Sequence, residues 1–338
     1  MTLKTDVAII GAGPVGLFAI FECGMVGLRC HVIDALDVAG GQCSALYPEK
    51  PIYDIPGFPR ISGAELVERL ETQAAPFNPV FHLGQRVDQL QRLADGGFRL
   101  VTSKGLTLEA GAVIIAAGAG AFGPNRPPLP GIESYEGKAV HYYVRRAEDF
   151  RGKRVVIAGG GDSAVDWALA LHGIAAHIHF VHRRDQFRAA PDSVAKLGQL
   201  NGRGIDIVVP FQLAALEGDG TSLDAVVVTS LDGENRRLEA DALLAFFGLK
   251  SDLGPIANWG MELALHHLPV DPATCQTSQS GVFAIGDVAT YPGKLKLILT
   301  GFAEAAAAAH AIYPLLHDGQ PLHFEYSTSK GAPGLAAD

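Results

Sequence analysis

The sequence has few cysteines, and none of them lies where redox or metal chemistry would place it. The 338-residue chain contains four, and no two of them form a C-x-x-C pair: Cys23, Cys30, Cys43 and Cys275. This scatter excludes a dithiol motif and a cysteine-based metal site. We interpret the four as reduced structural thiols, because free cysteine is commonly buried. Thiols stay reduced in the cytoplasm, so we expect a cytoplasmic protein.

Long apolar runs and an excess of positive charge are also absent. The first apolar run, residues 7–10, meets a glycine turn at once, which argues against a signal peptide. No run approaches the roughly 20 residues of a membrane span. The net charge of −9 argues against general nucleic-acid binding. We therefore expect a soluble protein without a membrane or a nucleic acid among its partners.

Glycine, in contrast, is abundant, with 40 residues, and it marks two stretches built on one plan. Residues 6–34 and 154–182 each read as a buried strand, a glycine turn, a helical pattern and a second strand. In both, 23 positions separate the first glycine of the turn from the residue that ends the second strand. A chain of this length has room for two domains. We therefore predict an α/β protein with a duplicated βαβ unit.

The first turn contains Gly11, Gly13, Pro14 and Gly16 and fits the pattern G-x-G-x-x-G. Gly11 permits the tight turn, Gly13 lets the backbone approach a pyrophosphate, and Gly16 lets the helix pack on the strand. Asp34 closes the second strand, where a carboxylate can accept hydrogen bonds from ribose hydroxyls. The pattern predicts a dinucleotide site; the alternative is a glycine turn followed by a surface aspartate.

The second turn has the G-x-G-x-x-A form, and its second strand ends in basic residues instead of a carboxylate. A carboxylate there would repel a 2′-phosphate, whereas arginines bind one through charge-assisted hydrogen bonds. The second site is therefore predicted to take NADPH, which leaves FAD for the first; the alternative is a solvated basic turn. The expected NADPH-binding residues are Gly159, Gly161, Asp162, Ser163, Ala164, His182, Arg183, Arg184 and Arg188.

The remaining elements separate and complete these two units. Residues 98–109 have the pattern of a hairpin, and 112–117 read as an apolar strand that ends at a glycine. The pattern returns at 242–247, and 281–288 form another short buried strand with a glycine turn. The alanine-rich segment 303–311 predicts a packed helix, because alanine has the highest helix propensity.

The second turn and its basic cluster resemble the NADPH domain of thioredoxin reductases, and Gly286-Asp287 resembles the flavin-contacting aspartate motif of that family. In those enzymes a C-x-x-C lies just before the second glycine motif. Residues 138–158 of this chain contain no cysteine. Without a redox-active disulfide the flavin has no dithiol to reduce. The resemblance therefore implies the fold of a thioredoxin reductase and not its activity.

A closer resemblance is to the thioredoxin-reductase-like ferredoxin–NADP reductases of bacteria. It implies two doubly wound, three-layer dinucleotide-binding domains and a homodimer. The FAD domain would comprise residues 1–115 and 285–338, with the NADPH domain, 116–284, inserted into it and the tail covering the flavin. The segments that carry the resemblance span almost the whole chain: 40–50, 53–58, 118–122, 161–167, 253–259 and 326–329.

The same resemblance assigns roles to single residues at the FAD site. Tyr47 and Tyr326 would stack on opposite faces of the flavin ring, where offset aromatic contacts are favourable. The alternatives are a core tyrosine at 47 and an aromatic residue of an unordered tail at 326. Asp34 would bind the adenosine ribose. The remaining FAD contacts implied by the resemblance come from Gln42, Val87, Phe122, Gly286, Asp287 and Thr328.

The function implied is hydride transfer between NADPH and FAD, and transfer of single electrons between FAD and ferredoxin or flavodoxin. Hydride transfer needs alignment more than a protein acid, so no catalytic acid–base residue is expected. The helix 302–311 would point its N-terminus at the pyrimidine end of the flavin. Other acceptors (a quinone, oxygen or a separate dithiol protein) remain the main alternative, and a flavin-binding sensor without turnover is a second.

The histidines show no metal-binding pattern, and we expect no metal. We interpret five of them as surface residues or satisfied core residues: His141, His177, His179, His266 and His267.

A basic segment offers a docking site for an acidic electron carrier. Residues 138–154 hold six cations against Glu148 and Asp149, a local excess of four in a chain of −9. Such a patch would steer an acidic partner; the alternative is a solvated linker. The cations are Lys138, Arg145, Arg146, Arg151, Lys153 and Arg154.

Overall fold

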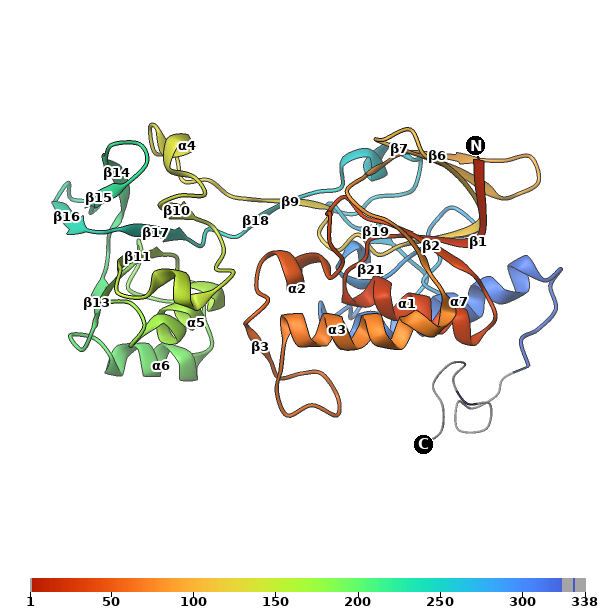
Figure 1. Ribbon diagram of the computed structural model, residues 1–338, viewed down its shortest axis with the longest axis horizontal. Coiled ribbons are helices and arrows are strands. Elements are labelled where there is room, and N and C mark those ends of the chain that lie inside the picture. The colour runs from red at the N-terminus through yellow and green to blue at the C-terminus, as the bar shows by residue number, and fades with distance from the viewer. Residues whose placement is uncertain (1, 324–330, 332–338) are drawn as a thin grey trace. The chain divides into compact units, whose positions relative to one another are not determined.

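The computed structural model describes residues 2–323 and Gly331, and of residues 121–124 and 249–251 it describes the backbone alone. Two compact units divide the chain. The first comprises Met1–Phe122 and Ser251–Asp338, and the second, Gly123–Lys250, lies between these two segments in the sequence. Figure 1 labels the elements of both units.

A mixed sheet forms the framework of the first unit. Its strands follow the order β5-β2-β1-β8-β7-β6, and β20 also pairs with β8. The short apolar run at residues 7–10 belongs to strand β1, which is buried between parallel neighbours on both sides. The strands are β1 (Thr2–Ile10), β2 (Cys30–Ile33), β5 (Val80–His82), β6 (Val87–Arg92), β7 (Phe98–Thr102), β8 (Thr107–Ile115) and β20 (Val282–Ala284).

Three helices, α1 (Pro14–Met25), α3 (Gly63–Ala74) and α7 (Ile298–Leu316), pack against one face of this sheet. Alternate side chains of β1 point to opposite faces. Val7 and Ile9 therefore join the core beneath the helices, whereas Ala8 and Ile10 join a second core on the other face.

The second core of this unit is covered by short elements of the chain after Leu253. These are η3 (Gly254–Asn258), β19 (Leu268–Pro269), η4 (Gly286–Val288) and β21 (Ala289–Thr290). Further short elements of the first unit are α2 (Gly41–Ala45), β3 (Pro51–Ile52), β4 (Ile61–Ser62) and η1 (Ala75–Phe77).

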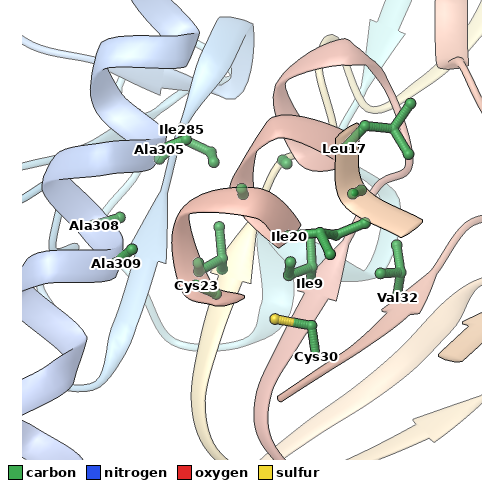
Figure 2. Packing of buried hydrophobic residues seen from close by; sticks show 14 of the residues in the cluster. Ile9, Leu17, Ile20, Cys23, Cys30, Val32, Ile285, Ala305, Ala308 and Ala309 are labelled. Atoms are coloured by element: carbon green, nitrogen blue, oxygen red, sulfur yellow. The ribbon is translucent and has the colours of Figure 1, made fainter. Parts of the chain in front are cut away.

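The alanine-rich segment forms the tightest helix packing of the first unit. Figure 2 shows Ala305, Ala308 and Ala309 of α7 turned toward the core that α1 and β1 share. A Cβ atom at Gly301 would lie 2.4 Å from Val15 Cγ2, so the two helices meet with no room for a side chain there. Small residues thus bring the start of α7 against the glycine turn that follows β1.

The second unit has its own three layers. A parallel sheet of order β10-β17-β11-β12-β13 is covered on one face by helices α5 and α6 and on the other by the antiparallel sheet β14-β15-β16. The elements are α4 (Ile132–Tyr135), β10 (Val140–His141), η2 (Ala147–Phe150), β11 (Arg154–Ala158), α5 (Asp162–Leu171), β12 (His177–Val181), α6 (Pro191–Gln199), β13 (Ile205–Val208), β14 (Gln212–Gly218), β15 (Leu223–Thr229), β16 (Asn235–Glu239) and β17 (Ala242–Ala245).

The predicted α/β class and the two dinucleotide-binding βαβ units are confirmed, and the longer helices lie on one face of each sheet. The chain returns to the first unit at Ser251 and not at residue 285. The reason is packing: Leu253, Ile256 and Leu268 fill the second core of that unit. Two strands, β9 (Ala121–Pro124) and β18 (Leu249–Asp252), pair where the chain passes between units.

Candidate functional site

The glycine turn after β1 is fixed by backbone packing at two of its three glycines. Gly11 has φ +110°, and a Cβ there would lie 2.3 Å from the carbonyl oxygen of Ala116. A Cβ at Gly16 would lie 2.0 Å from the carbonyl oxygen of Gly11. Gly13 differs, since its Cβ would meet only the Cα of Gly41, at 4.0 Å. Packing therefore explains two glycines, and the space before Gly13 is free for a ligand that approaches the backbone.

Asp34 lies at the end of β2 and braces the same turn. Its Oδ2 accepts a hydrogen bond from the amide of Ala12 at 2.6 Å, and its Oδ1 accepts one from the amide of Leu36 at 2.8 Å. Burial raises the pKa of this carboxyl, although both amide bonds favour the charged form. Asp34 also lines the cavity described next. It therefore has a structural role that its predicted contact with a ribose would supplement.

A cavity of about 490 Å³ opens at the carboxyl ends of the parallel strands of the first unit. Ligands of open α/β sheets bind at this edge, and the volume lies within the range of small-molecule sites. Gly16 packs beneath the turn and does not line the cavity. The predicted FAD residues in its wall are Gly11, Gly13, Pro14, Asp34, Gln42, Tyr47, Val87, Gly286 and Asp287.

Three predicted FAD-contacting side chains lie outside the part of the chain that the structure describes. Tyr326 and Thr328 lie outside the described residues, and the side chain of Phe122 lies outside them as well.

Tyr47 contributes an aromatic ring to the cavity wall, and its hydroxyl contacts Cys43. The thiol of Cys43 donates to the Tyr47 hydroxyl at 3.7 Å. Burial raises the pKa of Cys43 to about 11 and the pKa of Tyr47 well above its usual range. Both groups are therefore neutral near pH 7, and Cys43 is a structural thiol next to the cavity.

A buried ion pair that no sequence motif predicts supports Gly286. Glu304, from α7, accepts a hydrogen bond from the Gly286 amide at 2.7 Å and another from the Tyr291 hydroxyl at 2.7 Å. Its carboxylate also pairs with the ammonium group of Lys294, and these two side chains are 5% and 4% exposed. The signal that could have revealed this cluster is the single charged residue within the alanine-rich helix.

The start of α7 adds a positive group to the cavity wall. Lys296 lines the cavity together with Leu297 and Ile298. Its Nζ lies 2.8 Å from Nε2 of His267, whose pKa is lowered by burial and then by this lysine. The helix begins at Ile298, four residues before the predicted helix start at Phe302. Its amide dipoles and Lys296 favour negative charge in this part of the cavity.

In the glycine turn of the second unit, as in the first, packing requires some of the glycines and leaves another facing free space. A Cβ at Gly159 would lie 2.8 Å from the carbonyl oxygen of Phe246, and one at Gly160 would lie 2.3 Å from the ring of His182. A Cβ at Gly161 would meet no atom within 4 Å. Here too the protein packing leaves free the glycine that a phosphate would approach. Gly161 also precedes α5, whose first amides face the same space.

The residues that follow Gly161 tie the turn to its surroundings. Asp162 accepts a hydrogen bond from the amide of Ala190 at 2.9 Å and so links the start of α5 to the start of α6. Ala164 is buried, and Gly159 packs so close to it that a Cβ there would lie 2.9 Å from the Ala164 Cβ. Ser163 is exposed. Asp162 and Ala164 thus have packing roles, and Ser163 is available to a ligand.

The basic residues after β12 surround the entrance to this turn. The amide of Arg188 donates to the carbonyl oxygen of Gly160 at 2.7 Å, which places the whole segment beside the turn. Arg183, Arg184 and Arg188 are exposed, and none of them has an ion pair with a carboxylate of the described chain. The pKa of His182 is lowered by burial and then by these arginines. Positive charge is therefore concentrated on guanidinium groups that are free to bind an anion.

No cysteine lies in the second unit, and all four are free and buried in the first. The described residues therefore offer no dithiol beside either glycine turn. No helix of the described chain is long and apolar enough to span a bilayer.

Residues 5–310 match the family described as "Pyridine nucleotide-disulphide oxidoreductase". The chain belongs to this family. Two full-length relatives are named ferredoxin–NADP reductase. The one from Granulibacter bethesdensis is 64% identical over 98% of this chain and 95% of its own length. The one from Rhodospirillum rubrum is 59% identical over 99% of this chain and 98% of its own length. The resemblance to ferredoxin–NADP reductases is confirmed.

Two solved structures of thioredoxin reductases have the same fold. Thioredoxin reductase from T. acidophilum matches with a TM-score of 0.78 and 26% identity, over 92% of this chain and 98% of that one. Thioredoxin reductase from Lactococcus lactis matches with a TM-score of 0.79 and 24% identity, over 93% of this chain and 100% of that one. The predicted thioredoxin-reductase-like fold is thus confirmed as well.

Proposed function

We propose that this chain is a ferredoxin–NADP reductase that uses FAD and NADPH. The observation that carries the proposal is the open space in front of Gly13 and Gly161 within one chain, since two ligand-facing glycine turns imply two dinucleotides. Its full-length relatives bear the name of an enzyme that joins NADP to ferredoxin. FAD occupies the first unit and NADPH the second.

FAD fits the cavity of the first unit. Its pyrophosphate would lie over Gly13 and the first amides of α1, where the helix dipole favours anions. The ribose would meet Asp34, and the flavin ring would lie against Tyr47. Gln42, Val87, Gly286 and Asp287 complete the wall. We propose Phe122, Tyr326 and Thr328 as further contacts, with Tyr326 on the ring face opposite Tyr47.

NADPH fits the turn of the second unit. Its pyrophosphate would approach Gly161 and the start of α5, while the 2′-phosphate would bind Arg183, Arg184 and Arg188. Guanidinium groups without a carboxylate partner lose no ion pair when they bind a phosphate. NADH lacks this phosphate, so the same arginines give NADPH its advantage.

FAD when bound supplies the chemistry, since it takes a hydride from NADPH and releases electrons singly to a one-electron carrier. The residues of the chain bind and orient it. Glu304 holds the Gly286 turn, and Lys296 with the start of α7 favours negative charge at one end of the cavity. Burial keeps the hydroxyl of Tyr47 protonated, so the wall adds no negative charge there.

The acidic carrier, ferredoxin or flavodoxin, would dock on the basic segment 138–154. Three of its six cations have carboxylate partners: Arg146 with Asp149, Arg151 with Glu148, and Arg154 with Glu239 and Asp241. Lys138, Arg145 and Lys153 have no ion pair with a carboxylate of the described chain. Arg145 instead lies over the ring of Tyr143, and Lys153 over that of Phe150. The positive charge available to attract an acidic carrier is thus smaller than the six cations of the segment suggest. It comes from these three residues.

We propose a cytoplasmic homodimer, on the strength of the family resemblance and the four reduced thiols. Another acceptor, such as a quinone, oxygen or a separate dithiol protein, is the alternative to ferredoxin.

The test is anaerobic reduction of ferredoxins and flavodoxins by NADPH. The purified protein should be yellow and carry about one FAD per chain. It should reduce at least one ferredoxin or flavodoxin of its own organism faster than quinone, oxygen or thioredoxin. A colourless protein that added FAD does not restore would overturn the cofactor assignment. A yellow protein that NADPH reduces, but that prefers a quinone to every carrier, would overturn the acceptor assignment alone.

A further inference from the structure

Three side chains with metal-binding atoms meet on the sheet of the second unit, away from its glycine turn. His177 and His179 lie two residues apart on β12 and therefore point to the same face. Asp206 lies on the neighbouring strand β13, directly opposite His179 in the parallel register. The three ligand atoms all lie within 4.8 Å of one another. No other group of three such residues was found in the described part of the chain.

The distances suit a single ion. Asp206 Oδ2 lies 3.0 Å from His177 Nε2 and 3.9 Å from His179 Nδ1. Zinc binds imidazole nitrogen and carboxylate oxygen at about 2.0–2.2 Å, so neighbouring ligands of a tetrahedral site lie about 3.3 Å apart. Both distances to Asp206 lie within about 0.6 Å of this spacing, and the ligand atoms of the two histidines lie within 4.8 Å of each other.

His179 gives independent evidence that something is missing from this cluster. Its Nδ1 is buried and has no hydrogen-bond partner, although the carboxylate of Asp206 lies nearby. A buried polar atom without a partner is costly. The interpretation of His179 as a satisfied core residue therefore does not account for this nitrogen.

The surroundings allow a cation to enter. The side chains of His177, His179 and Asp206 are 32%, 17% and 48% exposed, so the cluster is supported from below and open to solvent. Arg154 pairs in register with His177 on the other side of β12. Its positive charge is offset by ion pairs with Asp241 at 2.6 Å and Glu239 at 2.7 Å.

We propose that His177, His179 and Asp206 form a binding site for a divalent transition-metal ion, with Zn²⁺ as its probe. Two imidazoles and one carboxylate provide three ligands, and water completes the coordination from the solvent side. The ion would clamp β12 to β13, the strand at the edge of the sheet. No redox step is involved, so the site is independent of the proposed reductase activity.

The test uses the full-length, flavin-loaded protein after removal of metals with a chelator. Zn²⁺ is titrated by calorimetry, and the zinc retained after gel filtration is counted by atomic emission. We expect about one Zn²⁺ per chain. His177→Gln, His179→Gln and Asp206→Asn should each weaken binding about 10- to 100-fold, the loss that even supporting residues of metal sites cause.

Two variants serve as matched controls. His172→Gln and Asp192→Asn alter exposed residues of the same unit that lie outside the cluster, and they should keep the affinity of the parent protein. No saturable binding with a Kd below about 0.1 mM would overturn the proposal, and so would equal binding by the cluster variants and the controls.

X-ray absorption at the zinc edge reads the ligands without any substitution, which matters if a cluster variant fails to fold. The expected first shell holds nitrogen and oxygen at about 2.0–2.2 Å. Sulfur at about 2.3 Å would place the ion on cysteine and overturn the site.

Discussion

The two glycine turns are subject to the same packing constraint, but the second strands of their βαβ units are followed by residues of opposite charge. In both, at least one glycine is required because a Cβ would strike a backbone carbonyl, and another faces free space. The first turn is closed by Asp34, whose two oxygens hold the amides of Ala12 and Leu36. The second is closed by the ring of His182, which lies against Gly160 and is followed by exposed arginines. On the proposed assignment, a common frame therefore carries two cofactor preferences, and the residues after the second strand distinguish them.

The units also differ in how their turns are supported. The cavity of the first unit rests on a buried ion pair between Glu304 and Lys294. The arginines beside the second turn lie at the surface and have no carboxylate partner in the described chain. We infer that the first site is built to hold its cofactor permanently and the second to exchange it. Four experiments test this contrast.

The largest effect is expected for cofactor choice at the second turn. Arg183→Ala combined with Arg184→Ala should raise the KM for NADPH strongly and leave that for NADH nearly unchanged. Each lost charge-assisted bond to the 2′-phosphate costs about 1.5–3 kcal/mol. Steady-state kinetics with both coenzymes measure this. Arg203→Ala, an exposed arginine of the same unit, is the control. Equal losses with NADPH and NADH would show that these arginines do not bind that phosphate.

Breaking the buried ion pair between Glu304 and Lys294 should give the next largest effect. It should lower the stability of the protein and leave its coenzyme preference unchanged. Glu304→Gln leaves the ammonium group of Lys294 buried without a counter-charge, and breaking a buried ion pair in this way costs about 3–5 kcal/mol. Urea unfolding and the FAD content after gel filtration measure the outcome. The double variant Glu304→Gln, Lys294→Met should regain part of the stability.

The matched control is Glu68→Gln, an exposed glutamate of α3, which should change neither stability nor FAD content. If Glu304→Gln unfolds at the same urea concentration as the parent protein, the buried pair does not support the cavity.

The two adjacent glycines of the second turn separate packing from ligand binding. Gly160→Ala would push a methyl group into the ring of His182 and should destabilise the protein by about 1–3 kcal/mol. Gly161→Ala meets no protein atom and should leave the melting temperature unchanged, yet weaken NADPH binding about tenfold, or 1.4 kcal/mol. Thermal melts and KM measurements compare the two. The reverse pattern would remove the argument that Gly161 faces the pyrophosphate.

The smallest effect should appear in association with the electron carrier. Arg145→Glu with Lys153→Glu removes two cations that lack a carboxylate partner and should slow reduction of ferredoxin at low salt about three- to tenfold. Reduction of a neutral dye should be unchanged. Arg151→Gln removes a cation that is already paired with Glu148, so it should slow the reduction of ferredoxin less than the double variant does. Equal slowing of ferredoxin and dye would assign the segment to motion of the second unit.

Local patterns were predictable from the sequence, and contacts between distant segments were not. The two glycine turns follow from short motifs in which strand, turn and helix are adjacent. The hydrogen bond that the Gly286 amide donates to Glu304 joins a turn to an alanine-rich helix 18 residues later, and no sequence spacing predicts it. The cluster around His179 depends on the register between β12 and β13, which brings Asp206 opposite. The start of the returning segment was missed for the same reason, because Leu253 and Ile256 are placed by packing.

The arginines after β12 have a consequence for how coenzyme preference can change. They are exposed, and none is tied into an ion pair within the described chain. Substituting them therefore removes no folded-state contact that holds the unit together, and surface changes of this kind usually alter stability by less than about 0.5 kcal/mol. If these arginines bind the 2′-phosphate as proposed, coenzyme preference can be re-engineered at these positions without compensating mutations elsewhere. Mutant libraries confined to Arg183, Arg184 and Arg188 should consequently yield a high proportion of folded, flavin-loaded proteins with altered NADPH and NADH preference.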